Sequence, residues 1–219
     1  MAKYKSRYYL KKEIEVIMNN LYQIDKRYRL FKSLCSGDCY ELICLKIPYS
    51  MKVVLNSLFD NTIIGLWKLL CDENEKSATV YDVIRLYKTN RDFFKEKKYY
   101  YAIDISIGKR VRIDFKYKDV QKSIAKLEDD LKNNKDIIKF IRKYRNKSLA
   151  HNDKKFKFDR KNKYSNKKIL YTDIEKLINT LIEDMNFISR DVFGNTHRFI
   201  HEEDKEVEYI CNLIRKACK

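Results

Sequence analysis

The chain has 219 residues, of which 44% are hydrophobic and 36% charged, and it contains one proline and four glycines. Large β-sandwiches and barrels use far more glycine and proline in their turns, so this composition argues against them and favours long helices in one domain, 1–219. The net charge of +17 favours polyanionic partners, nucleic acid before an anionic membrane surface, although lysine- and asparagine-rich composition also accompanies AT-rich genomes.

The N-terminus is basic but has no apolar segment behind it, and we find no apolar run of 18 residues. We therefore expect neither a secretory signal nor a transmembrane helix, and we expect a cytoplasmic location without membrane partners. In that compartment the cysteines should be reduced thiols.

Apolar residues at three- and four-residue steps predict helices over 8–34 and 49–71. The second stretch is apolar on nearly all faces, so we expect it to be the central core helix. Thr79 with Asp82 has the pattern of an N-terminal cap and predicts a third helix that continues into Phe94.

Residues 95–118 are ambiguous because they alternate only in part between apolar and polar residues. A small β-hairpin within about 99–117, turning near Gly108 and Lys109, is one interpretation, and a loop with its tyrosines folded onto the helices is the other. A helix resumes at 119, with an interruption near Asn133 and Asn134.

Residues 154–168 form a connector rich in lysine, asparagine and aromatic residues. Thr172 and Glu175 then form a capping-box pattern at the start of a strongly amphipathic helix, which Gly194 should end. A final helix is expected over about 202–217.

The segment 141–153 carries the chemistry that stands out most. Within seven residues it places Arg145, the adjacent amide of Asn146, and His151. Arginine binds phosphate by two parallel hydrogen bonds and keeps its charge, and histidine exchanges a proton near neutral pH. These abilities suffice to cut an RNA backbone without a metal. The alternative is that Arg145 pairs with a surface acid and His151 merely ends a helix.

In an ideal helix Arg145 and His151 would project roughly 120 degrees apart. Either His151 lies where the helix frays, or the pair acts across a dimer interface. Asn146 could bind the phosphate or orient His151, and Asp153 could hold the other ring nitrogen. Lys147 would lower the pKa of His151 if the two side chains face each other.

The residues around the motif are the expected RNA contacts, since they combine cations with flat rings. They are Arg142, Lys154, Lys155, Phe156 and Lys157. The alternative is a solvated loop whose aromatic residues pack onto the domain, and core or interface packing is favoured for Tyr99, Tyr100 and Tyr101.

We expect no metal and no other cofactor. Cys35, Cys39 and Cys44 have spacings near those of zinc sites, but a second pair would have to come from the distant Cys211 and Cys218. His197 and His201 share a helix face without a well-placed third ligand.

The spacing of Arg145 and His151 resembles the Arg-x(4–6)-His motif of HEPN domains. The fuller string Arg145-Asn-Lys-x-x-Ala-His-x-Asp resembles the AbiU-type abortive-infection branch, and residues 55–60 and 66–70 resemble the helix behind its motif. The resemblance covers about 50–190. It implies an all-α HEPN-like bundle, here with an N-terminal helix within 1–45, an insertion at 95–118 and a C-terminal helix within 200–219.

The resemblance implies a homodimeric, metal-independent endoribonuclease that acts as a toxin or antiviral effector, with an antitoxin or other regulatory protein as a further partner. Arg145 would stabilise the phosphate, and His151 would act as general base or acid while the ribose 2'-hydroxyl attacks phosphorus, leaving a 2',3'-cyclic phosphate. Two other hypotheses are a non-catalytic HEPN-like module that binds RNA or a partner, and a helical partner-binding protein whose charge is compositional.

Overall fold

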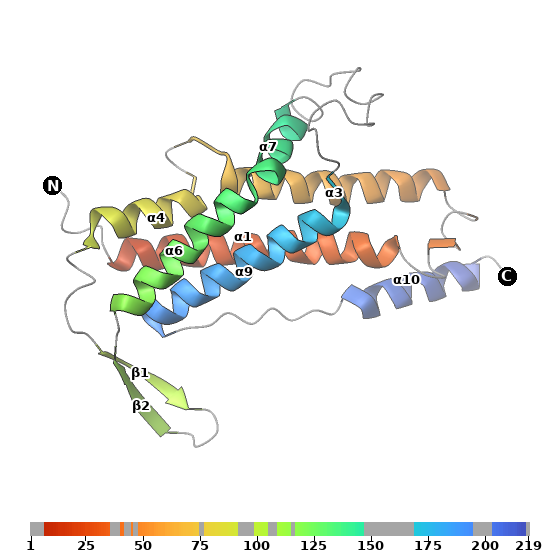
Figure 1. The fold of residues 1–219 in the computed structure, drawn as a ribbon. Helices are drawn as coiled ribbons and strands as arrows, with labels where there is room; N and C mark the ends of the chain where they lie inside the picture. The colour runs from red at the N-terminus through yellow and green to blue at the C-terminus, as the bar shows by residue number, and fades with distance from the viewer. Residues whose placement is uncertain are drawn as a thin grey trace.

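The protein is a bundle of helices with a β-hairpin at one end, seen in a computed structural model (Figure 1). The structure describes residues 7–35, 40–41, 45, 48–74, 77–91, 99–104, 109–114, 117–146, 169–194 and 203–217. Their elements are α1 (Arg7–Leu34), α3 (Pro48–Leu70), α4 (Val80–Thr89), β1 (Tyr99–Asp104), β2 (Lys109–Asp114), α6 (Tyr117–Asn133), α7 (Lys135–Tyr144), α9 (Tyr171–Phe193) and α10 (Glu203–Ala217). The expected all-α fold class is confirmed.

The centre of the bundle is α1, which packs against α3, α4, α9 and α10. Its residues Ile14, Ile17 and Leu21 are buried on the face that the three- and four-residue spacing defines. The expectation that 49–71 would be the central helix is wrong. The N-terminal half of α3 leaves Tyr49 and Val53 largely exposed, whereas Ile63, Leu66 and Leu69 of its C-terminal half are fully buried.

The crossing of α1 and α3 is close at Gly65. A Cβ built on this glycine would lie 2.6 Å from Cγ1 of Ile24, so the absence of a side chain lets the two helices approach. Beyond the crossing, Ile63, Leu66 and Leu69 of α3 are fully buried in the core. This contact fixes the part of α3 that faces α7.

Among the residues that the structure describes, one helix, Tyr49–Leu70, is long and apolar enough to cross a membrane when judged by length and composition alone. Only 28% of the apolar window is buried in the bundle. Core helices of soluble proteins pass the same test, and the buried Ile63, Leu66 and Leu69 belong to this helix. The finding is therefore weak evidence for a membrane.

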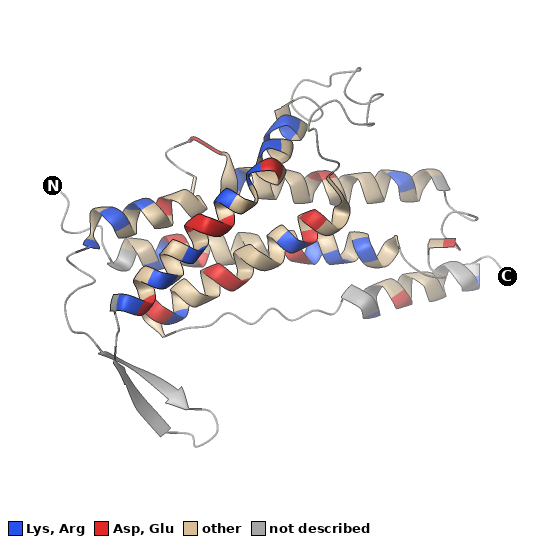
Figure 2. Cartoon of the chain, viewed as in Figure 1, with Lys and Arg blue, Asp and Glu red and all other residues tan. Residues whose placement is uncertain are grey.

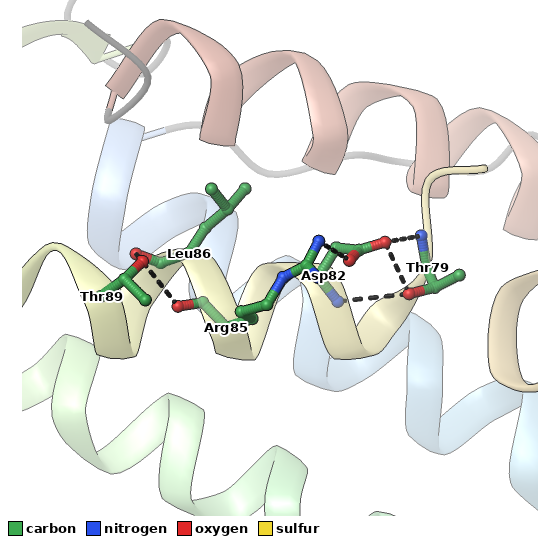
Figure 3. Close-up of polar contacts among 5 residues, drawn as sticks. All are labelled: Thr79, Asp82, Arg85, Leu86 and Thr89. Carbon is green, nitrogen blue, oxygen red and sulfur yellow. Dashed lines mark hydrogen bonds and ion pairs between the residues drawn. The ribbon is translucent and has the colours of Figure 1, made fainter. Parts of the chain in front are cut away.

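The predicted cap of the third helix is confirmed at α4 (Figure 3). The amide of Asp82 donates to Thr79 Oγ1, and Asp82 Oδ2 accepts from the Thr79 amide at 3.0 Å. Arg85 adds an ion pair to the same carboxylate at 2.7 Å. The predicted continuation into Phe94 is wrong where the structure describes it, because α4 ends at Thr89 and Asn90 leaves helical geometry with φ −121° and ψ 28°. Residues 92–94 lie outside the described residues.

The predicted interruption near 133–134 is also confirmed, because α6 ends at Asn133 and α7 begins at Lys135. The capping box predicted for Thr172 and Glu175 is wrong. The helix α9 already begins at Tyr171, and Asp173 Oδ2 accepts the amide hydrogen of Leu170 at 2.8 Å. The predicted stop is confirmed, since Gly194 adopts the left-handed conformation with φ 74°.

The hairpin interpretation of the ambiguous segment is the one that the structure shows. The strands β1 and β2 pair antiparallel, with Tyr99 opposite Asp114 and Asp104 opposite Lys109. The hairpin lies at the end of α6 away from α7 (Figure 1). It is therefore remote from the C-terminal end of α7, where the candidate motif begins.

The cysteines differ in part from the expected set of reduced thiols. Cys35 and Cys71 are reduced thiols, but Cys211 takes part in a disulfide. Cys211 is buried in a small apolar cluster with Leu34, Met51 and Val207. Cys39, Cys44 and Cys218 lie outside the described residues.

Candidate functional site

The C-terminal end of α7 is fixed to α3 by Tyr144, the residue before the candidate arginine. Its hydroxyl donates to Asp60 Oδ1 at 2.7 Å, and only 8% of Tyr144 is exposed. A hydrogen bond to a charged group contributes roughly 1.5–3 kcal/mol, so this contact holds the helix end firmly.

Aromatic rings surround this anchor and connect four helices. The ring of Phe59 on α3 packs edge-on against Tyr144 of α7 and Tyr171 of α9, at centroid distances of 5.9 and 5.1 Å. Phe31 of α1 joins the cluster at 5.5 Å from Phe59. Tyr144 precedes the segment 147–168 and Tyr171 follows it. The residues that flank this segment on both sides therefore belong to the same aromatic cluster.

Arg145 follows α7 directly and keeps helical angles, with φ −57° and ψ −49°. Its amide donates to the carbonyls of Ile141 and Arg142, and the helix widens into a π turn at residues 145–146. Such turns occur frequently at functional sites. The side chain crosses to α3, where its Cζ lies 4.1 Å from the ring centroid of Trp67.

The guanidinium of Arg145 also donates through Nη1 to Oδ1 of Asn146 at 3.1 Å. Within the described part of the chain, no ion pair joins Arg145 to a carboxylate. The pKa of Asp72 is lowered, first by its hydrogen bond from Ser77 and only in smaller part by the charge of Arg145. The alternative in which Arg145 pairs with a surface acid therefore finds no support among these residues.

Basic residues, among them Arg142 and Lys143, lie in the last turn of α7 before the motif (Figure 2). Arg142 is half exposed and lies 3.8 Å from the carboxylate of Glu73, itself mostly exposed. A pair so open to solvent contributes about 0–1 kcal/mol, so a polyanion could displace it readily. Beneath it, burial raises the pKa of the Cys71 thiol, and Arg142 opposes the shift.

The structure thus brings together three of the expected site residues, Arg142, Arg145 and Asn146. The others lie outside the described residues: Lys147, His151, Asp153, Lys154, Lys155, Phe156 and Lys157. The candidate metal residues Cys39, Cys44, Cys218, His197 and His201 lie outside them as well. Among the residues that the structure describes, no group of three potential metal ligands occurs.

Two residues at the site were given no role from the sequence, although the family resemblance placed both on the helix behind the motif. Trp67 lies against Arg145 and Asp60 binds Tyr144, yet each is separated from its partner by more than 70 residues. A further signal was that Trp67 is the single tryptophan of the chain. That signal identifies an unusual residue but not its partner.

A second polar cluster joins α6 to α9 away from this site. Asp184 is fully buried and accepts a short hydrogen bond from Lys126, which also contacts Asp130. Burial raises the pKa of Asp184 to about 6, because the loss of hydration outweighs the attraction of Lys126. One oxygen of Asp184 has no hydrogen-bond partner, so this carboxylate is costly to ionise.

The helical bundle has the fold class expected of a HEPN domain, and a HEPN family model matches residues 10–207, which shows the class of this protein. The family is described as AbiU2, and the chain belongs to it as an abortive-infection-related HEPN domain. The matched range is wider than the 50–190 compared by motif, since it includes most of α1. Searches of curated proteins and of solved structures found no match.

Proposed function

We propose that this protein is a metal-independent endoribonuclease of the HEPN type that acts as a toxin or antiviral effector. It cleaves cellular RNA in the cytoplasm as a homodimer, under the control of an antitoxin or another regulatory protein. The observation that carries the proposal is Arg145, a guanidinium stacked on Trp67 at the end of α7 with no carboxylate partner among the described residues.

Three features support this function over a purely structural role for the motif. The chain belongs to an abortive-infection family of HEPN domains. The anchor from Tyr144 to Asp60 and the aromatic cluster hold the helix end that presents Arg145. The net charge of +17 favours a polyanionic substrate.

The reaction is an internal transesterification at the RNA backbone. The ribose 2'-oxygen forms a bond to the adjacent phosphorus as the bond to the 5'-oxygen of the next nucleotide breaks. His151 takes the 2'-hydroxyl proton or supplies a proton to the departing 5'-oxygen. Arg145 binds the phosphate oxygens and stabilises the charge that develops on them. The products are a 2',3'-cyclic phosphate and a 5'-hydroxyl.

The proposal is tested by incubating total cellular RNA with purified protein in EDTA. We expect the wild type to cut and His151→Ala and Arg145→Ala to lose about 100-fold or more in rate, as for removal of a general acid–base group or a charge-stabilising donor. End-group analysis should find cyclic phosphates. Loss of activity with an unchanged circular dichroism spectrum separates a chemical role from misfolding.

Matched controls come from the same chain. His197→Ala removes a histidine outside the motif, and Arg190→Ala removes an arginine that also lies over an aromatic ring, at 4.9 Å from Phe187. Both should cut like the wild type. Equal cutting by all variants would point to a contaminating nuclease and would remove the support for Arg145 and His151.

A non-catalytic RNA-binding module is the second candidate, because Arg142 and Arg145 present cations at one helix end irrespective of His151. This candidate predicts folded protein that binds RNA without cutting it. Binding would weaken as salt rises and would survive His151→Ala, since counterion release depends on the phosphate contacts alone.

A further inference from the structure

Trp67 has an environment that differs from that of an ordinary core residue. It lies near the C-terminal end of α3, between the fully buried Leu66 and the exposed Lys68, and it packs only in part against the core. The guanidinium of Arg145 covers its ring at 4.1 Å. The indole is thus anchored by the bundle and in contact with the proposed phosphate-binding group.

The geometry leaves the arginine's hydrogen-bonding edge available. All N–H groups of a guanidinium lie in its plane, so stacking of its face on an aromatic ring consumes none of them. Asn146 accepts one hydrogen bond through Nη1. The stack and this bond restrict the rotamers of a long side chain, which would otherwise have to be ordered when a phosphate binds.

We propose that Trp67 is a positioning residue that holds Arg145 in the orientation needed for the scissile phosphate, an inference that rests on the proposed function. The indole does not touch the substrate in this role. It acts through Arg145, and α3 contributes to a site that the motif after α7 does not complete alone. Tryptophan provides the strongest cation–π attraction of the aromatic residues, and phenylalanine retains part of it.

The first test compares the cleavage kinetics of Trp67→Leu and Trp67→Phe with the wild type. We expect Trp67→Leu to lower kcat about tenfold with little change in KM, because a misaligned guanidinium loses stabilisation of the transition state more than ground-state binding. Trp67→Phe should recover most of the rate. If Trp67 only stabilised the fold, Trp67→Leu would lower the melting temperature without lowering kcat selectively over KM.

The matched control is Phe187→Leu. Phe187 is also half-buried and lies beneath a cation, Arg190, on the distant helix α9. Its substitution should affect stability in a similar way but leave kcat unchanged. A fall in kcat for both variants would show that loss of any such ring disturbs the enzyme, and it would overturn the assignment.

The second test does not require cleavage, because Trp67 is the sole tryptophan and its fluorescence reports the stack directly. We expect Arg145→Ala to change the emission of the free protein. A 2'-O-methyl RNA, which cannot be cleaved, should alter the emission of the wild type but not that of Arg145→Ala.

The outcomes separate the two proposals. Wild-type protein that does not cut RNA contradicts the proposed function, while the emission experiment still decides whether Trp67 holds Arg145 at an RNA site. Full kcat in Trp67→Leu, with activity lost in Arg145→Ala, overturns the positioning role and leaves the proposed function intact. Identical emission of wild type and Arg145→Ala overturns the positioning role in either case.

Discussion

At the scale of single residues, Asp184 gives the bundle a pH-dependent stability. Its folded pKa of about 6 exceeds the ordinary 3.8, chiefly because of burial, so the folded state binds this proton more tightly than the unfolded state. The stabilisation is complete below pH 3.8 and is lost as pH rises to about 6. It belongs to the contact between α6 and α9 and not to the proposed active site.

We predict that Asp184→Asn removes this dependence. The difference in unfolding free energy, wild type minus variant, should be greater at pH 4 than at pH 7 by on the order of 1–3 kcal/mol. Urea denaturation followed by circular dichroism measures it. Lys126→Met should shift the transition to higher pH, because the carboxylate then loses its cation. Parallel pH profiles for wild type and Asp184→Asn would contradict the prediction.

At the scale of the elements, the two helix starts show what local sequence can predict. Thr79 and Asp82 have the right residue types at the right spacing, follow a polar loop, and form the predicted box. Thr172 and Glu175 have the same pattern, but the packing of Tyr171 against Phe31 and Phe59 draws the helix start back to Tyr171. A tertiary contact therefore outweighed the cap that the sequence offered.

We predict that Leu170→Ser stabilises the protein by about 1 kcal/mol, because it supplies a side-chain acceptor at an uncapped helix start. Leu170 has the extended backbone of a cap position and is 48% exposed, so little apolar contact is lost. Thermal or urea unfolding measures the change. Thr172→Ala is the informative comparison: it should be nearly neutral here, whereas a loss of about 1 kcal/mol would restore Thr172 as the cap.

The same reasoning separates what could be predicted of the site from what could not. Arg145 and Asn146 were identifiable because their chemistry lies in one short string. The resemblance placed Asp60 and Trp67 on the helix behind the motif, but it did not predict their contacts with Tyr144 and Arg145. Those contacts depend on the angle at which α7 crosses α3, and the crossing depends on packing between residues far apart in sequence. Periodicity places a residue on a helix face but does not specify the partner of that face.

At the scale of the whole molecule, the proposed homodimer decides which arginine and which histidine meet at one reaction centre. Its two motifs provide two arginines and two histidines, which form two reaction centres if each centre uses one arginine and one histidine. If each reaction centre combines Arg145 of one protomer with His151 of the other, two inactive variants can complement each other.

We predict that dimers assembled from Arg145→Ala and His151→Ala recover activity. In a mixed dimer one centre lacks both groups, and the other has an intact arginine from one protomer and an intact histidine from its partner. Random reassociation of equal amounts makes about half of the dimers mixed, so about a quarter of the wild-type rate should return. The rate is measured on RNA after refolding the two variants together.

Variants refolded separately and then combined, without exchange of protomers, are the control and should remain inactive. A mixture that stays inactive while mass spectrometry detects mixed dimers would place each centre within one protomer, where the π turn after α7 would have to bring His151 to Arg145.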